Sequence, residues 1–277
     1  MLYLPKEYEP YRTQFESSQL EYIKITTMPT SNDALSLTQS KFGGYPYMPE
    51  GFDYPRNAKG NMMPLLAQIN FAEVPPLAGF PSSGLLQFYA TADDMMGMHE
   101  EFDSEFPVTQ KNYRVVYHSS FTQEEGSRIF ADIPTTAASE FDFVPGSYAL
   151  QLEKTVGYVP LSGVDCQQIF GEYHFENLQE EIDDYEESDR LRMEYYAKNS
   201  EEFVQHKIGG YANPVQEDLR KGTRKKPSQM AHYQQLLQIA SDGHIRWADM
   251  GVAHFFIDPA DLKALDFSRV IYYWSCG

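Results

Sequence analysis

The feature that most constrains this chain is that its sequence repeats. Four short blocks near residues 41–118 recur in the same order near residues 207–274. The blocks are Lys-apolar-Gly-Gly-Tyr, a Gln-Ile pair in an apolar run, Gly-x-x-x-Phe-aromatic, and Arg-Val-apolar-Tyr, at offsets of 166, 170, 167 and 155 residues. The shorter last offset places the length difference in one connection, where repeats usually vary. We therefore predict an internal duplication. The alternative is that strand-rich segments resemble one another through composition alone.

Most of the repeated blocks lie in apolar runs of strand length. The 20 Tyr and 18 Phe residues also favour strands over helices. We expect strands at residues 22–26, 65–71, 84–89, 113–118, 148–152, 236–239, 251–256 and 269–272. Two segments favour helices: residues 5–20, with aromatics at helical spacing, and the strongly acidic residues 172–202. The prediction is an α+β, β-rich, internally duplicated fold with peripheral helices.

We expect residues 1–277 to form a single globular unit with three parts. Pseudo-repeat A covers about 36–118, a central acidic and helical segment about 119–203, and pseudo-repeat B about 204–277. The central segment carries much of the chain's charge, because residues 172–202 hold twelve acidic against three basic side chains, a net of −9.

Charge and composition exclude several classes of protein. With 40 acidic and 22 basic residues the formal charge is −18, which repels a phosphate backbone and an anionic membrane surface. No apolar run approaches the ~20 residues of a membrane span, and charge and proline interrupt the N-terminus too early for a signal peptide. We therefore expect no nucleic-acid or membrane partner and a cytoplasmic location.

The two cysteines, Cys166 and Cys276, match neither a disulfide framework nor the spacing of zinc ligands. Reduced thiols agree with a cytoplasmic protein, although a single bridge between them stays open at this stage. No motif indicates a cofactor or a metal, and the spacing of the acidic insertion Asp93–Glu105 departs from that of a calcium loop.

Alignment of the repeats selects the candidate ligand-binding residues. Gln68 and Gln238 occupy matching positions inside apolar strands, where a buried amide must be hydrogen-bonded. They could converge on a shared ligand, or each could bond to backbone. The paired glycines of the repeats permit positive φ and could form anion-binding nests, or they could simply turn the chain; they are Gly43, Gly44, Gly209 and Gly210.

His206 and Asp249 are the best placed titratable residues of the second repeat. In a functional reading they meet across a cleft as a base and its orienting acid. In a structural reading the histidine is hydrogen-bonded internally and the aspartate caps a turn. One basic cluster, residues 220–226, could grip phosphate, but in so acidic a chain we expect a mobile loop that contacts the acidic segment 172–202. We assign no catalytic residue.

Six blocks of the chain resemble a known family. They are Lys41-Phe42-Gly43-Gly44-Tyr45-Pro46, Leu66-Ala67-Gln68-Ile69-Asn70, His206-Lys207-Ile208-Gly209-Gly210-Tyr211, Leu237-Gln238-Ile239, Trp247-Ala248-Asp249-Met250-Gly251 and Asp266-Phe267-Ser268-Arg269-Val270. In type and order they resemble the YwqG-like family of bacterial proteins, from about residue 36 to the C-terminus. The resemblance implies an α+β fold with substantial sheet, no established activity, and an association with toxin and immunity genes.

The leading functional hypothesis is a cytoplasmic, immunity-like factor that binds a protein partner of basic character, because high negative charge steers such a partner into contact. The second is an enzyme or small-molecule binder whose site lies between the repeats and uses Gln68, His206, Gln238 and Asp249. A third holds that the duplication only stabilises a scaffold, without a pocket shared by the repeats.

Overall fold

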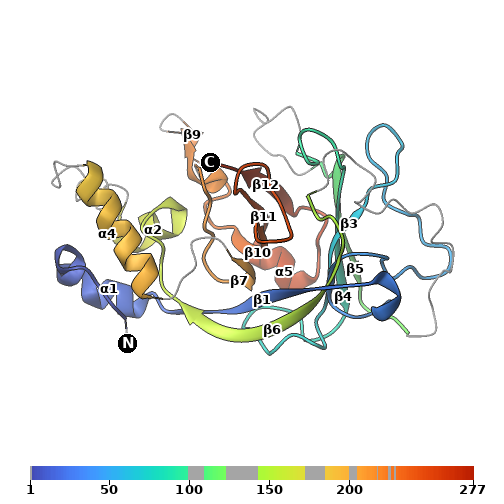
Figure 1. Ribbon diagram of the computed structural model, residues 1–277, viewed down its shortest axis with the longest axis horizontal. Coiled ribbons are helices and arrows are strands. Elements are labelled where there is room, and N and C mark those ends of the chain that lie inside the picture. The colour runs from blue at the N-terminus through green and yellow to red at the C-terminus, as the bar shows by residue number, and fades with distance from the viewer. Residues whose placement is uncertain are drawn as a thin grey trace.

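A computed structural model gives the arrangement of the chain (Figure 1). It describes residues 2–98, 109–122, 143–171, 185–199, 205–216, 218–223, 226–227 and 229–277. The expected helical segment 172–202 therefore lies partly outside the described residues, as does most of the acidic insertion.

Helices and short 3-10 turns punctuate a chain built mainly of strands. The helical elements are η1 (Lys6–Tyr11), α1 (Arg12–Ser17), η2 (Asn32–Ala34), α2 (Gly163–Phe170), α4 (Tyr185–Lys198), η4 (Leu219–Lys221) and α5 (Pro259–Ala264). The strands are β1 (Leu20–Thr30), β2 (Lys41–Gly43), β3 (Leu65–Asn70), β4 (Leu85–Ala90), β5 (Tyr113–His118), β6 (Ser147–Gly157), β7 (His206–Gly209), β8 (Gly222–Thr223), β9 (Lys226–Pro227), β10 (Gln234–Ala240), β11 (Val252–Ile257) and β12 (Ile271–Ser275).

Ten of the described strands form one antiparallel sheet in the order β12-β11-β10-β7-β1-β6-β2-β3-β4-β5. Its centre is the long pair of β1 and β6, which runs in register from Leu20 opposite Gly157 to Thr30 opposite Ser147. We call β2 to β5 the first arm, and β7 with β10 to β12 the second arm. Each arm adds four strands outward from the central pair, so the strand order is symmetric about its middle.

The sheet curls until the inner faces of the two arms meet and it is nearly closed. The ring centroids of Phe88 in β4 and Phe255 in β11 lie 4.7 Å apart, although six strands separate these two in the sheet order. One continuous core of buried apolar side chains includes residues of β1, of both arms and of the loop that carries Trp247. Burial of this shared apolar surface is the main force that keeps the sheet curled.

The middle strands of both arms are buried on both faces. Every residue of β3, β4 and β11 is buried, which explains why their sequences are continuous apolar runs rather than alternating ones. The inner face packs on the opposite arm, and loops that follow β2 and β7 cross the outer face, where Tyr47 and Asn213 bond to strand side chains.

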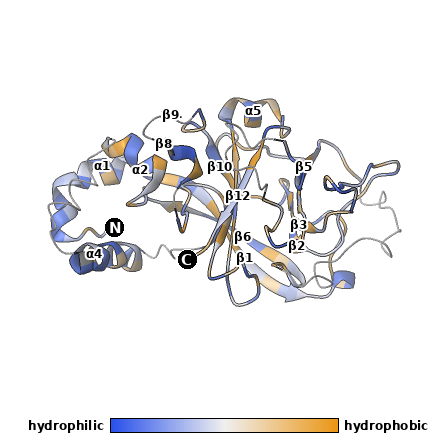
Figure 2. Ribbon diagram, turned by 90° about the horizontal axis from the view of Figure 1, so that it is seen from above, coloured by the Kyte–Doolittle hydropathy of each residue, from blue (hydrophilic) through white to orange (hydrophobic). Residues whose placement is uncertain are grey.

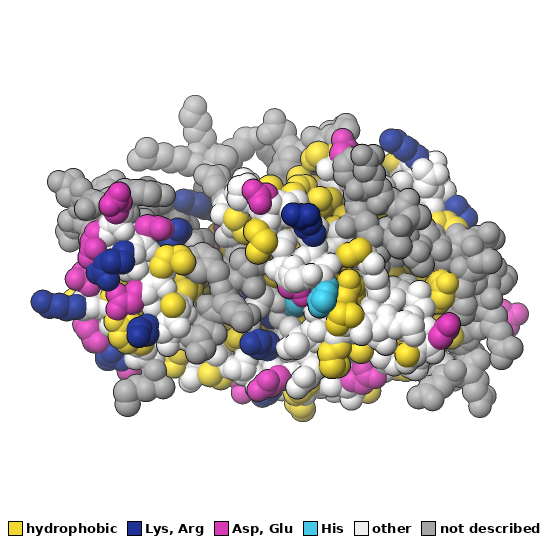
Figure 3. All heavy atoms as spheres, in the orientation of Figure 1, with side chains coloured by type: hydrophobic (Ala, Val, Ile, Leu, Met, Phe, Trp, Pro, Cys, Tyr) yellow, Lys and Arg dark blue, Asp and Glu magenta, His cyan; other side chains and the backbone are white. Residues whose placement is uncertain are grey.

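A separate, smaller core joins the N-terminal segment to α2 and α4 at one end of the molecule (Figures 1 and 2). Phe15 of α1 packs against Phe170 and Tyr195, with ring centroids 4.8 and 5.4 Å away. Charged side chains gather on the surface of this helical end, where acidic and basic groups alternate (Figure 3). Among the described helices, none is both long and apolar enough to cross a membrane.

The β-rich α+β prediction is confirmed, and all eight expected strand regions contain or overlap strands. The expected helix over residues 5–20 is split into η1 and α1, because Pro10 lacks the amide hydrogen that a continuous α-helix needs there. The prediction that residues 220–226 form a mobile surface loop is wrong for Arg220, whose side chain is buried.

Candidate functional site

The two glutamines selected by the repeats do not converge; each holds its own arm together. Gln68 is fully buried in β3. Its Oε1 accepts hydrogen bonds from the backbone amide of Tyr47 at 2.9 Å and from Nε2 of Gln87 at 2.9 Å. Its Nε2 donates to the carbonyls of Leu37 and Gln39, both at 2.8 Å. Three of the four hydrogen bonds of this amide hold the loops on either side of β2, and the fourth joins it to Gln87 of β4.

Gln238 plays the matching part in the second arm. It is fully buried in β10, accepts from the amide of Asn213 at 3.1 Å and donates to the carbonyl of Gln205 at 2.8 Å. Both partners belong to the chain on either side of β7. Both glutamines thus bond mainly to backbone, and among the described residues their hydrogen-bond partners lie in or beside their own arm.

Each arm carries a transverse row of buried polar side chains on its outer face, and each glutamine is the middle member of one row. Lys41 lies opposite Gln68, and Gln68 opposite Gln87. In the second arm, correspondingly, Lys207 lies opposite Gln238, and Gln238 opposite His254. Polar groups in such a layer must bond to the protein itself, and the loops around β2 and β7 supply most of their partners, while His254 bonds to Gln235 in β10.

The two buried lysines differ in their surroundings. Lys41 donates from Nζ to the carbonyl of Ser36 at 2.8 Å, and burial lowers its pKa to about 8 despite the opposing influence of Glu73. Lys207 donates from Nζ to Oδ1 of Asn213, and its Nζ lies 5.5 Å from the ring centroid of Tyr22. Both lysines thus anchor the loops that cover their arms.

The paired glycines turn the chain from β2 and β7 into the crossing loops. Their φ angles are 62° and 72° at Gly43 and Gly44, and 70° and 69° at Gly209 and Gly210. A Cβ at Gly43 would lie 2.0 Å from the carbonyl oxygen of Gly146, so this glycine is required by close backbone packing. The contacts are with the protein's own atoms, as expected of turns rather than of an exposed anion nest.

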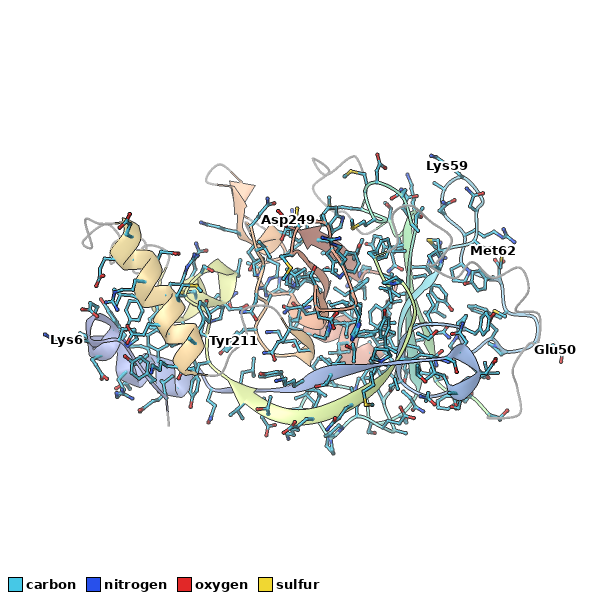
Figure 4. The ribbon with its side chains drawn as sticks, viewed as in Figure 1. Lys6, Glu50, Lys59, Met62, Tyr211 and Asp249 are labelled. Carbon is cyan, nitrogen blue, oxygen red and sulfur yellow. The ribbon has the colours of Figure 1, made fainter. Side chains whose placement is uncertain are left out.

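His206 pairs with Asp242, not with Asp249. Its Nδ1 accepts from the backbone amide of Ala240 at 3.0 Å, which leaves the hydrogen on Nε2 to donate to Oδ2 of Asp242 at 3.0 Å. The imidazole is buried, and the ring of Phe42 meets it edge-on at 5.3 Å. Asp249 is exposed, on the connection between β10 and β11 (Figure 4), and its carbonyl accepts from the amide of Gly277.

Asp242 is the site residue that sequence reasoning missed. Burial acts to raise its pKa, but hydrogen bonds from His206, from the amides of Ile245 and His244, and from Thr27 outweigh burial and hold the pKa well below the usual range. The carboxylate therefore stays charged and ties β7 and β1 to the turn after β10. A Ser-Asp-Gly turn at residues 241–243 was the available signal, but it does not name the partner.

A second buried ionic group surrounds Arg220. Its guanidinium bonds to Oδ2 of Asp165 at 2.7 Å and to Oδ2 of Asp218 at 2.8 Å, and it lies over the ring of Phe256 at 4.6 Å. Burial opposes the charge of Arg220, but the two carboxylates outweigh it and raise the arginine's pKa. This arginine therefore fastens α2 to the second arm instead of offering a phosphate contact.

His254 is the one member of the transverse rows with a buried side-chain nitrogen that lacks a hydrogen-bond partner among the described residues. Its Nδ1 lies 2.8 Å from Oε1 of Gln235, while its Nε2 has no hydrogen-bond partner among the described residues. Burial lowers the pKa of this histidine to about 3, and nearby Lys207 and Arg220 act in the same direction against Asp218. The ring is consequently neutral at physiological pH.

The acidic insertion and the two cysteines are the remaining candidates from the sequence. The described part of the chain contains no group of three or more His, Cys, Asp or Glu side chains placed to hold a metal ion. In the acidic insertion, Asp93 accepts from the amide of Gly97 at 3.0 Å, and residues 99–108 lie outside the described residues. Cys166 and Cys276 are free thiols, so the disulfide left open by the sequence is not formed.

A groove lies where the ends of the two arms approach each other. It has a volume of about 590 Å³ and is lined by residues of β5, of the turn before it and of the connection from α5 to β12: Thr109, Gln110, Arg114, Val115, Val116, Tyr117, Leu265, Phe267 and Ser268. We call it the seam groove. None of the four residues proposed for a site between the repeats lines it.

Comparison with protein families now places the chain. The model of a family described as a domain of unknown function, DUF1963, matches residues 40–276, which include both arms and the central pair except for β1. The chain belongs to the DUF1963 family. No curated protein matches it. Membership in DUF1963 thus agrees with the expectation of a family without an established activity, and any function must be argued from the structure itself.

Proposed function

We propose that this DUF1963 protein acts by binding a protein partner of basic character. The supporting observation is the distribution of charge. The chain carries a formal −18. Among the described residues, three cations, Lys41, Lys207 and Arg220, and two acids, Asp218 and Asp261, are buried. Burial therefore leaves the surface strongly negative, so that it attracts a basic partner over a distance of about one Debye length and raises the association rate.

The contacts of the buried polar groups support the same proposal. Gln68, Gln238 and His206 make their hydrogen bonds to the protein's own loops and strands. The two glutamines hold the loops around β2 and β7, and His206 holds the turn after β10. A rigid scaffold with a charged surface is suited to recognition, because little conformational freedom is lost when it binds.

Capture from native cells tests the proposal. Tagged protein is purified at low salt and at ~0.5 M salt, where surface attraction is screened. We expect a stoichiometric basic protein that is recovered at low salt and released at high salt. Failure to recover a stoichiometric protein at low salt, or recovery of an acidic one that ignores salt, would refute the proposal.

A charge variant sharpens this test. Replacing the six acids Glu172, Glu176, Glu180, Glu181, Asp183 and Asp184 by their amides lowers the magnitude of the net charge from 18 to 12. We expect slower association with the captured partner at low salt. The same variant at high salt is the control, since screening removes the difference there.

We also propose that the two arms descend from one duplicated unit, in a bacterial, YwqG-like branch of the family. Support comes from the symmetric strand order, from matching Lys-Gln registers and from a β-bulge at the start of both β3 and β10. We propose a cytoplasmic location on the ground of the two free thiols, which suit a reducing compartment.

A further inference from the structure

The seam groove runs beside the outer edge of β5. In the described part of the chain β5 pairs with β4 alone. The amide of Val115 donates to the side chain of Gln110 instead of to β4, so the backbone of Val115 faces the outer edge. Orientation alternates along a strand, and Tyr117 therefore faces the same edge. Such an edge is a template for another extended chain.

Gln110 shows that the gap at the seam is one strand wide. Its Oε1 accepts from the amide of Val115 on one wall at 2.9 Å. Its Nε2 donates to the carbonyls of Phe267 and Ser268 on the other wall, at 2.8 and 3.1 Å. A peptide unit of an inserted strand would use its C=O and N–H in the same two directions. The side-chain amide thus holds the place of one peptide unit of a strand between β5 and the connection to β12, and an added strand that pairs with Val115 would displace it and make the same bonds.

The groove has a size and floor suited to a few residues of extended chain. Its volume, about 590 Å³, falls within the range of ligand pockets. Tyr117 and Phe267 approach each other across it, with ring centroids 5.0 Å apart, and Leu265 on its rim is an exposed apolar side chain. An occupant would therefore place apolar side chains over aromatic and aliphatic surface while its backbone pairs with β5.

The positive charge of the groove favours an added strand that carries a carboxylate. Arg114 is exposed, and among the described residues that line the groove it is the one charged side chain. A guanidinium beside a strand edge favours a carboxylate on the added strand, since opposite charges on paired strands attract. The basic partner of the proposed function is attracted by the whole surface, whereas this contact concerns one residue of the bound segment.

We propose that the seam groove binds an extended peptide segment that adds to the edge of β5, completes the closure of the sheet and places a carboxylate side chain against Arg114. This inference rests on the proposed function, protein recognition, and names the surface and the kind of segment that it recognises. Strand addition of this type derives its affinity from backbone hydrogen bonds and its specificity from alternate side chains.

Defined peptides test the inference without knowledge of the partner. The probes are acetylated, fluorescein-labelled heptapeptides of alternating Thr and Val with a central Glu, and matched peptides with Gln or Lys at the centre. Fluorescence polarisation on the full chain measures their affinities. We expect the Glu peptide to bind about tenfold more tightly than the Gln peptide, and the Lys peptide to bind most weakly.

Two variants locate the contact. In Arg114→Glu we expect the order of the Glu and Lys peptides to reverse. Lys6→Glu is the matched control, because Lys6 is exposed at the opposite, helical end of the molecule (Figure 4) and the change in net charge is the same. Arg114 is exposed, so we expect the variant to fold, and circular dichroism checks this. Equal binding of the Glu and Lys peptides to the unaltered protein, or an unchanged preference in Arg114→Glu, would overturn the assignment.

Peptides with methylated backbone amides test whether the bound segment pairs with the backbone of β5. Two further Glu peptides carry N-methyl groups on alternate residues, one in each phase of the strand. Strand addition predicts at least a tenfold loss for one phase, because its N–H groups pair with β5. Binding of both methylated peptides with unchanged affinity would refute strand addition.

The two proposals fail in different ways. If no peptide binds, and Arg114→Glu still captures the native partner, the groove assignment is refuted while the proposed function stands. If the Glu peptide binds as expected but no partner is captured from cells, the groove assignment stands and the proposed function is refuted.

Discussion

Nη2 of Arg220 lies 2.8 Å from Oδ2 of Asp218, and both side chains are almost completely buried, with exposures of 2% and 1%. Replacing Asp218 by Ala leaves the arginine with Asp165 as its only carboxylate partner among the described residues. We expect this change to lower the free energy of unfolding by about 3–5 kcal/mol, the range for breaking a buried ion pair from one side. Urea denaturation monitored by circular dichroism measures the loss.

An exposed ion pair provides the comparison. Lys154 and Glu21 lie 2.8 Å apart on the central pair of strands, with side-chain exposures of 36% and 48%. Lys154→Met should change stability by about 1 kcal/mol or less, because solvent screens such a pair. Equal effects of the two replacements would contradict the structural role given to Arg220.

Gln68→Leu should destabilise the protein more than Gln238→Leu. The first change leaves three backbone groups without their partner in Gln68, those of Leu37, Gln39 and Tyr47, while Nε2 of Gln87 keeps its bond to the carbonyl of Tyr47. The second leaves two, those of Asn213 and Gln205. At about 1–3 kcal/mol for each buried group left unsatisfied, we expect the two losses to differ by about 1 kcal/mol or more.

Thermal and urea unfolding of the two leucine variants check this order. If Gln68→Leu were as stable as the unaltered protein, the amide would not hold the loops around β2, and a role in ligand binding would regain support.

The elements that could be predicted from the sequence are those fixed by local pattern. The continuous apolar runs at residues 65–71 and 251–256 marked strands buried on both faces, and the match of Gln68 with Gln238 identified positions that prove equivalent in contact and register. These features depend on neighbouring residues or on similar blocks within the same chain, so one sequence is enough to find them.

The contacts that could not be predicted depend on chain segments far apart in sequence. His206 bonds to Asp242 across 36 residues, and which acid it meets is decided by how the turn after β10 folds back over β7. Arg220 belongs to a basic cluster typical of an exposed loop, and the second carboxylate that makes its burial favourable, beside that of Asp218, comes from Asp165, 55 residues earlier. The seam groove depends on the curl of the whole sheet.

The two turn glycines that begin the crossing loops should differ in their tolerance of a methyl group. At Gly43 an added Cβ lies 2.0 Å from a backbone oxygen of Gly146, which cannot move without breaking the adjoining strand pairing. At Gly209 the nearest atom is Cδ2 of Leu77, 2.9 Å away at the flexible end of a side chain. Both have positive φ, which costs an alanine about 1–2 kcal/mol. We expect Gly209→Ala to lose about that amount and Gly43→Ala clearly more, as measured by urea denaturation; equal losses would contradict the packing at Gly146.

The buried His254 should make stability depend on pH. Its pKa is about 3 in the folded protein because of burial, against about 6.5 for an exposed histidine. Between these values the unfolded chain binds a proton that the folded chain does not, so stability falls as pH falls below about 6.5. The expected slope is roughly 1.4 kcal/mol per pH unit. Urea denaturation at several pH values from 7 to 4.5 measures it, in a window above the normal titration of most carboxylates.

His254→Gln removes the group and should flatten this slope by about one proton, whatever its effect on stability at pH 7. His118→Gln is the comparison, because burial also lowers the pKa of His118, but this histidine is only partly buried and its Nε2 lies 3.0 Å from Oε1 of Gln87. We expect it to change the slope less. The outcome against this account is a dependence of stability on pH, between pH 6 and 4.5, that is the same with and without His254. The imidazole would then be charged in the folded protein, with a proton on Nε2.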